Sequence, residues 1–316
     1  MLLPSKKNIE QAYLTVKRFA HRTPVLTSQS INRILGCEVF FKCENFQKVG
    51  AFKFRGATNA VFNLSEDEAQ RGVCTHSSGN HAAAIALAAS LRGIPSYIVM
   101  PINAPTIKRK AVEGYGAIIT TCEPTQAHRE SKLDEVQRRT GATFIHPYDN
   151  FNVICGQGTA SMEMLDDVSD LEIIITPVGG GGLLSGTLIY TKETNPRISV
   201  YAGEPQNADD AHRSLRDGIL YPSINPNTIA DGLRTSLSPL TFSIIQKYSD
   251  GILTVPEALI VEAMQLIWER MKIIIEPSSA VPVAAIIQNL SKFKGKKVGV
   301  IISGGNVELE KLPFGY

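Results

Sequence analysis

Cysteine is scarce in this sequence and never occurs in a spacing typical of metal binding or redox chemistry. The six histidines are equally scattered and form no zinc-type pair. These absences argue against a disulfide scaffold and against a structural zinc site. We therefore expect reduced thiols and a cytoplasmic protein. The 316 residues include five cysteines, an odd number without a C-x-x-C pair: Cys37, Cys43, Cys74, Cys122 and Cys155.

Long apolar runs and a strong charge of either sign are also missing. No stretch reaches the length of a membrane span, and the first 20 residues contain no uninterrupted apolar run that could act as a signal sequence. The apolar residues between Ile9 and Phe19 instead recur at helical spacing and predict an amphipathic helix. A net charge of +2 gives no reason to expect nucleic acid or a membrane surface as a partner.

What the sequence does have is a regular alternation of short β-rich runs and helical patterns. Hydrophobic residues make up 43% and charged residues 20%, as in soluble globular proteins, and the length favours about two domains. Because the runs are almost continuously apolar, we expect an α/β fold with open parallel sheets covered by helices on both faces, in two interleaved lobes. Binding sites in such sheets form at the carboxyl ends of the strands. Predicted strands are 37–42, 72–75, 96–100, 117–122, 143–146, 172–178, 198–204, 251–255 and 297–303, and predicted helices include 81–91 and 258–272.

A run of four glycines follows one of these strands, in the segment TPVGGGGLLSG at 176–186. Successive glycines allow backbone N–H groups to converge on a phosphate at the start of a helix. The G-x-G-x-x-G spacing of dinucleotide sites is absent, because Leu184 or Ser185 stands where the third glycine is required. There is no P-loop G-K-[ST] either. The segment therefore favours a single monoester phosphate, with a flexible glycine turn as the alternative.

Polar residues gather at two other predicted strand ends. The turn in THSSGNHAAA carries Ser77, Ser78, Asn80 and His81. So many donors at a helix start favour a carboxylate or ring-oxygen site, with a simple helix cap as the alternative. Ser303 ends the strand in VGVIISGGN, where a serine is either a turn residue or the partner of a ring nitrogen.

Lys53 lies between Phe52 and Phe54 in the segment FKFRG. A lysine in apolar company is either a cation that extends to water or a buried amine kept for chemistry. Burial disfavours the charged ammonium and leaves a nucleophilic amine. Together with a monoester phosphate site and a hydroxyl at a strand end, Lys53 indicates pyridoxal phosphate held as a Schiff base, with the pyridine ring as electron sink.

Through these and further motifs the sequence resembles the fold-type II pyridoxal-phosphate enzymes, and among them the serine racemases and serine/threonine dehydratases. The likeness covers essentially the whole chain. It implies the tryptophan synthase β-like arrangement, with a large cofactor-binding domain of residues 1–71 and 150–316, a small domain of residues 72–149 inserted in it, and the cofactor between them. The further matching segments are HRTPVLTS (21–28), FFKCENFQKVGAFKFRGATNAV (40–61), GQGT (156–159), EPQNADD (204–210), TIADGL (228–233) and ERMKIIIEP (269–277).

The resemblance implies a role for each residue of the cofactor site. Lys53 is similar to the Schiff-base lysine that also serves as the base on one face of Cα, and Asn80 to the partner of the ring hydroxyl. Ser303 corresponds to the partner of the pyridine nitrogen, and a serine there, unlike an aspartate, does not enforce a ring proton. The implied cofactor-binding residues are Phe52, Lys53, Asn80, Gly179, Gly180, Gly181, Gly182, Leu183, Glu276, Ser303 and Gly304.

The resemblance also implies a substrate site. Racemisation by two bases needs proton donors on both faces of Cα, and Ser78 corresponds to the serine that faces the lysine across the cofactor in the racemases. Threonine dehydratases usually have alanine there, whereas hydroxyaspartate dehydratases share the serine, so Ser78 is compatible with both activities. Arg129 has a solvated helix charge as its alternative interpretation. The implied substrate-binding residues are Ser77, Ser78, Asn80, His81, Arg129 and Ser236.

The acidic segment GEPQNADDAHRS (203–214) is similar to the divalent-cation site of the racemases. Its implied ligands are Glu204, the Ala208 carbonyl and Asp210, hard oxygen donors that suit Mg²⁺, Ca²⁺ or Mn²⁺. We expect such a cation to support the structure rather than the chemistry. An acidic loop without a ligand is otherwise a solvated turn.

The sequence matches the nucleotide site of the mammalian racemases only in part. Lys48, Tyr115, Lys272 and Asn306 match the ATP site of the mammalian racemases, but Ala83 stands where those enzymes have glutamine. The sequence ends soon after the SGGNV motif, so we expect no C-terminal regulatory domain of the biosynthetic threonine dehydratase type and no inhibition by isoleucine.

We therefore expect a homodimeric pyridoxal-phosphate enzyme that acts on a small amino acid, interconverting L- and D-serine and also eliminating water from serine to give pyruvate and ammonia. The first alternative is an ammonia-lyase for L-threonine or 3-hydroxyaspartate with little racemisation. A third possibility is a protein without catalytic activity that binds a phosphorylated ligand, but this interpretation gives Lys53 and Ser303 no function.

Overall fold

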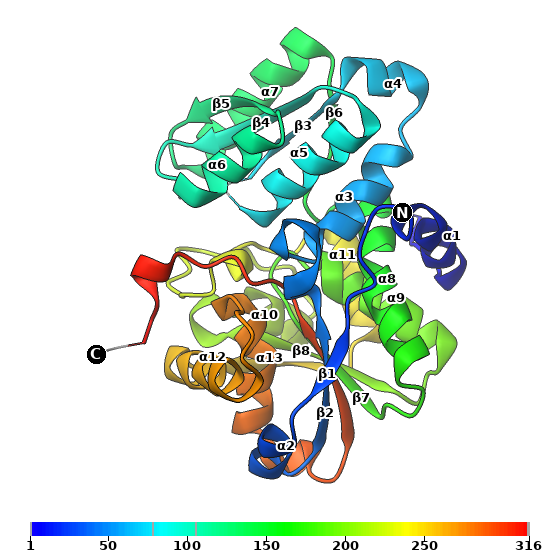
Figure 1. Cartoon of the computed structure of the whole chain (residues 1–316), viewed down its shortest axis with the longest axis vertical. Helices are drawn as coiled ribbons and strands as arrows, with labels where there is room; N and C mark the ends of the chain where they lie inside the picture. The colour runs from blue at the N-terminus through cyan, green and yellow to red at the C-terminus, as the bar shows by residue number, and fades with distance from the viewer. Residues whose placement is uncertain (1, 78, 105, 315–316) are drawn as a thin grey trace.

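The computed structural model describes residues 2–77, 79–104 and 106–314 and contains two β-sheets (Figure 1). The first has the order β1 (Val25–Thr27), β2 (Glu38–Cys43), β10 (Lys297–Ile302), β7 (Ile173–Pro177), β8 (Ser199–Pro205) and β9 (Gly251–Val255). The second has the order β5 (Ile118–Cys122), β4 (Ser96–Pro101), β3 (Val73–His76) and β6 (Thr143–Phe144). Among the described strand pairs only β1 and β2 are antiparallel. The expected α/β fold with two parallel-type sheets is confirmed.

All nine predicted strands are present, with ends displaced by no more than two residues. The strand predicted at 143–146 is shorter and pairs only through Thr143 and Phe144. Strand β1 was not predicted, because three residues are too few to establish a period along the chain. Strand β1 is defined by its pairing with β2, in which Val25 lies opposite Lys42 and Thr27 opposite Phe40.

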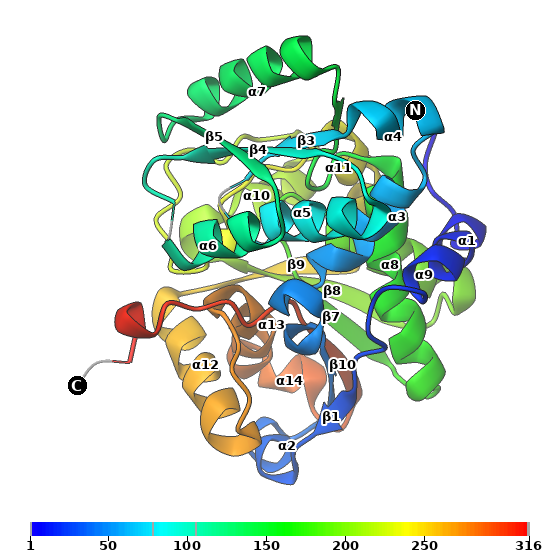
Figure 2. The ribbon, with the colours of Figure 1, turned by 45° about the horizontal axis from the view of Figure 1, so that its top comes forward.

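Helices cover both faces of the six-stranded sheet (Figures 1 and 2). Along β10, Val300 and Ile302 point into one core and Ile301 into the other, which explains why the strand is apolar at successive positions. One core is closed by α2 (Gln29–Leu35), α12 (Glu257–Met271), α13 (Pro277–Gln288) and α14 (Leu290–Phe293). The other is closed by α1 (Lys6–Val16), α8 (Phe151–Asp167), α9 (Gly182–Thr194) and α11 (Pro239–Tyr248), with α10 (Asp210–Asp217) beside β9.

The four-stranded sheet lies between α7 (Gln126–Thr140) on one face and α5 (Asn80–Arg92) and α6 (Thr106–Gly114) on the other (Figure 2). Local sequence sets the ends of α7, because the Thr125 side chain accepts the His128 N–H and Gly141 adopts the left-handed conformation. Helix α3 (Lys53–Phe62) packs against both α5 and α8 and so joins the two halves of the molecule, and α4 (Glu66–Arg71) precedes β3.

Helices α8 and α9 contact each other backbone to backbone. A Cβ atom on Gly186 would lie 2.5 Å from the Gly158 nitrogen, so a larger residue there would force the helices apart. This contact holds the first turn of α9 at the carboxyl end of β7. The GQGT segment therefore has a packing role that fixes the position of the glycine loop.

The predicted amphipathic helix near the N-terminus is α1, which buries Ile9, Ala12 and Val16. All five cysteines are free thiols and buried. Among the described helices, none combines the length and the apolar character needed to cross a lipid bilayer.

Candidate active site

The predicted site residues follow the carboxyl ends of strands in both sheets. Lys53 opens α3 about ten residues after β2, Ser303 ends β10, and the glycine loop joins β7 to α9. Ser77 and the start of α5 follow β3 of the small sheet. These segments meet where the two sheets face each other, in the region around α3 and the start of α5 (Figure 1).

Lys53 is half-buried, and its Nζ donates a hydrogen bond to the Pro147 carbonyl at 3.1 Å. The ammonium lies 5.1 Å from the centre of the Phe52 ring. Burial lowers the pKa of Lys53 to about 8, although the nearby Glu276 carboxylate opposes this shift. A much larger fraction of this amine is neutral at physiological pH than for an exposed lysine, so Lys53 can act as a nucleophile or a base.

Backbone hydrogen bonds tie the Lys53 segment to two others. The Phe52 N–H donates to the Ser303 carbonyl at 2.9 Å, and the Gly305 N–H donates to the Gly50 carbonyl at 2.9 Å. The Glu276 N–H donates to the Gly304 carbonyl at 3.0 Å. Lys53, Glu276 and Ser303 are thus held in one rigid arrangement although they are far apart in sequence.

The glycine loop is buried and supplies free donors. Within the described chain, the N–H groups of residues 179–184 have no hydrogen-bond partner, and Gly181 has φ +85° immediately before α9. A Cβ atom on Gly180 would lie 2.2 Å from the Tyr148 ring, so that only glycine fits. Unpaired buried N–H groups at the start of a helix suit a phosphate monoester, so the loop fits the phosphate of pyridoxal phosphate.

The Asn80 side chain is hydrogen-bonded to Glu276 and Asn306, which lie in segments next to the six-stranded sheet. Its Nδ2 donates to both Glu276 oxygens, at 3.1 and 3.0 Å, and its Oδ1 accepts from Asn306 Nδ2 at 2.9 Å. Burial and the neighbouring Asp231 raise the pKa of Glu276 to about 7, while the hydrogen bond from Asn80 lowers it. Asn80 therefore has a fixed orientation next to a carboxyl group that titrates near neutral pH.

The predicted substrate residues come from three places. Ser77 Oγ accepts the Gly79 N–H at 3.2 Å, and the buried His81 donates through Nε2 to the Ile145 carbonyl at 3.0 Å. Arg129 lies half-buried on α7, and Ser236 Oγ accepts the Ser223 N–H at 2.8 Å. The start of α5 thus brings together Ser77, Asn80 and His81. Ser78 lies outside the described residues.

The predicted cation ligands occupy seven residues at the end of β8. Glu204 accepts the N–H groups of Ala211 and His212 at 2.9 and 2.8 Å, and Asp210 begins α10 just after the Ala208 carbonyl. Burial raises the pKa of Asp210 to about 6 and that of Glu204 well above its usual value. Neither carboxylate forms an ion pair within the described residues, so the two acids fit a cation. Among all the described residues, no group of three or more His, Cys, Asp or Glu side chains is arranged to bind a metal ion.

Three groups near Lys53 were not found from the sequence. The Pro147 carbonyl accepts the Lys53 hydrogen bond, the Tyr148 ring packs on Gly180, and Tyr148 Cβ packs on Gly182. Both follow β6, and their position at a strand end is the signal that could have identified them. Ser279, whose Oγ lies 2.9 Å from Ser303 Oγ, sits in the first turn of α13 and has no such signal.

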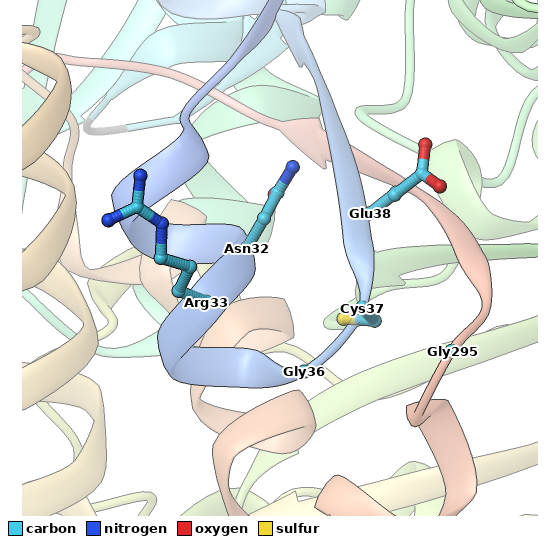
Figure 3. A pocket seen from close by; sticks show the side chains of 6 residues that line it. All are labelled: Asn32, Arg33, Gly36, Cys37, Glu38 and Gly295. Carbon is cyan, nitrogen blue, oxygen red and sulfur yellow. The ribbon is translucent and has the colours of Figure 1, made fainter.

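A surface hollow of about 280 Å³ lies at the opposite edge of the large sheet (Figure 3). It is formed where α2 turns into β2 and where the chain approaches β10, at the amino ends of both strands. Asn32 Oδ1, one of its polar atoms, already accepts the Val39 N–H at 3.0 Å. Because the hollow lies at the amino ends of β2 and β10, it is separate from the Lys53 site, which lies beyond the carboxyl ends of the strands. Its lining residues are Asn32, Arg33, Gly36, Cys37, Glu38 and Gly295.

Comparisons with known proteins identify the same chemistry. Residues 16–304 match the family model described as pyridoxal-phosphate dependent enzyme. The chain is 51% identical to serine racemase from Dictyostelium discoideum over 310 residues, covering 97% of this chain and 96% of that protein. It is 47% identical to beta-hydroxyaspartate dehydratase from Paracoccus denitrificans (strain Pd 1222) over 314 residues, covering 99% and 100%. The structure of maize serine racemase superimposes with a TM-score of 0.96 and 43% identity, covering 98% of this chain and 96% of that one.

Proposed function

Because the chain belongs to the family of pyridoxal-phosphate dependent enzymes, we propose that it is a serine racemase that also converts serine to pyruvate and ammonia. The observation that carries this proposal is the half-buried Lys53 amine with a lowered pKa, tied to Ser303 by the Phe52 backbone. The similarity to serine racemases over nearly the whole chain supports serine as the substrate.

The residues of the site divide the binding of pyridoxal phosphate among them. The N–H groups of Gly179 to Leu183 would hold the phosphate, and Lys53 would bind the aldehyde carbon. Ser303 would contact the ring nitrogen, and Asn80 would contact the ring hydroxyl. Phe52 packs near the ring, and Glu276 and Gly304 close the site. When bound, the cofactor withdraws electrons from the substrate Cα and so makes its hydrogen acidic.

Lys53 acts as the proton acceptor on one face of the substrate. Its pKa of about 8 places it close to physiological pH, where a base is most effective. Racemisation needs a second group that returns a proton from the other face, and we assign this role to Ser78. If instead the β-hydroxyl takes up a proton and leaves as water, 2-aminoacrylate results, and water then hydrolyses it to pyruvate and ammonia.

Ser77, Asn80 and His81 orient the substrate carboxylate, and Arg129 and Ser236 lie on the substrate side. The Ser77 hydroxyl and the Gly79 N–H with which it bonds start the turn that leads into α5. A second candidate function is elimination from 3-hydroxyaspartate or threonine with little racemisation. The dehydratase from Paracoccus denitrificans, similar over its whole length, favours 3-hydroxyaspartate within this alternative.

Incubation with L-serine is expected to yield both D-serine and pyruvate. Chiral chromatography of the amino acid and an enzymatic assay of the keto acid measure the two products, alongside D-serine, L-threonine and both 3-hydroxyaspartate diastereomers as substrates. In Ser78→Ala, D-serine formation should fall about 10²- to 10⁴-fold, because one of the two proton-transfer groups is gone. Pyruvate without D-serine from the wild type would refute the racemase proposal and favour the dehydratase.

We also propose that Glu204, the Ala208 carbonyl and Asp210 bind Mg²⁺, Ca²⁺ or Mn²⁺, with water completing the shell. The support is two buried carboxylates without an ion pair, since a cation would compensate charges that are costly to bury. Glu204 lies near the end of β8 and Asp210 begins α10, whereas Lys53 begins α3. We therefore assign the cation a structural role rather than a part in the reaction.

Removal of divalent cations by a chelator is expected to lower the melting temperature by about 5 °C, because a ligand at 100 times its Kd stabilises a protein by about 2.7 kcal/mol. Differential scanning calorimetry of the cofactor-loaded enzyme, before and after Mg²⁺, Ca²⁺ or Mn²⁺ is returned, measures the effect. Asp210→Asn should respond to neither treatment. Equal melting temperatures for chelated and metal-loaded wild type would exclude the cation.

The remaining assignments are a homodimer in the cytoplasm and a small domain of residues 72–149 inserted into a large domain of residues 1–71 and 150–316. The five free, buried thiols support a reducing compartment. Sedimentation equilibrium tests the dimer, and limited proteolysis near residues 72 and 149 tests the division.

A further inference from the structure

Ser303, the proposed partner of the cofactor ring nitrogen, is hydrogen-bonded to a second serine, Ser279. Ser303 ends β10 and Ser279 lies in the first turn of α13, and both are buried. Their Oγ atoms are 2.9 Å apart, so one hydroxyl donates to the other. A hydroxyl has a single hydrogen, and the direction of this bond therefore decides what Ser303 can offer to a ring nitrogen.

The backbone of Gly304 surrounds Ser279 with one donor and one acceptor. The Gly304 N–H donates to Ser279 Oγ at 2.8 Å, and Ser279 Oγ lies 2.7 Å from the Gly304 carbonyl, to which it can donate. That carbonyl also accepts the Glu276 N–H at 3.0 Å. The Ser279 hydrogen can therefore turn from the carbonyl to Ser303 without leaving a buried acceptor unpaired.

We propose that Ser279 is a positioning residue that makes Ser303 a hydrogen-bond donor to the pyridine nitrogen of pyridoxal phosphate. The chain of donors runs from the Gly304 N–H to Ser279, from Ser279 to Ser303, and from Ser303 to the ring nitrogen. The inference rests on the proposed function, because it needs the cofactor at Lys53.

Each bond in this chain strengthens the next. Ser279 accepts from the Gly304 N–H, which makes its own hydroxyl a better donor, and Ser303 gains in the same way. The reverse direction, with Ser303 donating to Ser279, would present lone pairs to the ring and would suit only a protonated nitrogen. Ser279 thus holds the ring nitrogen in its unprotonated, hydrogen-bonded state, which limits how strongly the ring withdraws electrons.

A structural role alone is the competing explanation, since Ser279 also ties α13 to the end of β10. The ¹⁵N chemical shift of the ring nitrogen separates the two roles, because a structural tie does not determine ring protonation. The holoenzyme is prepared with pyridoxal phosphate labelled at the pyridine nitrogen. Ser279→Ala removes the donor and Ser279→Cys replaces it with a weaker one. Ser278→Ala is the matched control, since Ser278 is also buried and, among the described residues, its Oγ accepts the Gly232 N–H alone, at 3.2 Å.

The wild type is expected to show the shift of an unprotonated, hydrogen-bonded ring nitrogen. Ser279→Ala should move this shift and weaken cofactor binding about fivefold, as for one hydrogen bond, with Ser279→Cys between the two. Ser278→Ala should leave the shift in place. A protonated ring in the wild type overturns the proposal. An unchanged shift in Ser279→Ala, whatever its cofactor affinity, also overturns it, and Ser279→Cys takes the place of that variant if Ser279→Ala does not fold. If the wild type takes up no cofactor, the proposed function itself has failed.

Discussion

Lys53→Ala is expected to lower the rates of racemisation and elimination about 10⁴-fold or more and to abolish the visible absorption band of the lysine-bound cofactor. The two roles proposed for Lys53 are lost together, namely the covalent link to the cofactor and the base on one face of the substrate. Lys53 Nζ donates to the Pro147 carbonyl, next to Tyr148, which packs on the glycine loop, and an alanine side chain has no amine to replace it. Absorption spectroscopy and steady-state assays with L-serine measure the two effects.

Two variants serve as controls for this prediction. Lys53→Arg keeps a positive charge but has no free amine, because guanidinium does not lose its proton at accessible pH, and it should be as inactive as alanine. Lys17→Ala removes an exposed lysine and should behave as the wild type. If Lys53→Ala retained the absorption band or a tenth of the activity, another residue would carry the cofactor.

Arg55→Leu is expected to destabilise the protein by about 3–5 kcal/mol, because it leaves a buried carboxylate without its counter-charge. Arg55 is fully buried and donates through Nε and Nη2 to Glu44, at 2.7 and 2.8 Å. It also donates to Glu163, which is paired with the buried Lys42 at 2.8 Å and so keeps one partner. Within residues 2–77, 79–104 and 106–314, the Glu44 carboxylate then keeps the hydrogen bond from the Thr23 hydroxyl and no other side-chain partner. Urea unfolding followed by far-UV circular dichroism measures the loss.

The double variant Arg55→Leu/Glu44→Leu tests the cause. It removes the stranded charge together with Arg55, so it should be more stable than Arg55→Leu alone. If the double variant were less stable by the sum of two independent losses, unpaired charge would not be the reason. Since Arg55 is two residues from Lys53 on α3, the same network fixes the helix that carries the reactive amine.

Residues whose chemistry is visible within a few positions of the chain could be predicted from the sequence. Four glycines after an apolar strand, a lysine between two phenylalanines and a serine at a strand end are such local signals. The structure places the glycines and Ser303 directly after strands, and it places Lys53 at the start of a helix whose preceding residue is bonded to Ser303. The alternation of strands and helices likewise predicts the sheets, since each strand of a parallel sheet has its own apolar run. The roles of these residues toward a cofactor stay predictions.

Features created by contacts between distant segments could not be found in this way. Ser279 reads as an ordinary residue in the first turn of a helix, and only the contact with β10 places it beside Ser303. The pairing of Arg55 and Lys42 with Glu163 spans more than 100 residues. Strand β1 depends on its neighbour for its existence. Whether Ser78 faces the ring also depends on tertiary structure, and that residue lies outside the described chain.

The bonds between Asn80 and its two partners have a mechanical consequence. Asn80 follows a strand of the small sheet, whereas Glu276 and Asn306 belong to segments of the large sheet. Lys108 on α6 reaches Asp231 across the same boundary, at 2.6 Å. Any hinge motion that widens the gap between the sheets must pull these pairs apart and wet the Glu276 carboxyl, whose proton affinity then falls toward that of an acid in water. A movement that breaks these pairs is therefore coupled to a lower proton affinity of the Glu276 carboxyl.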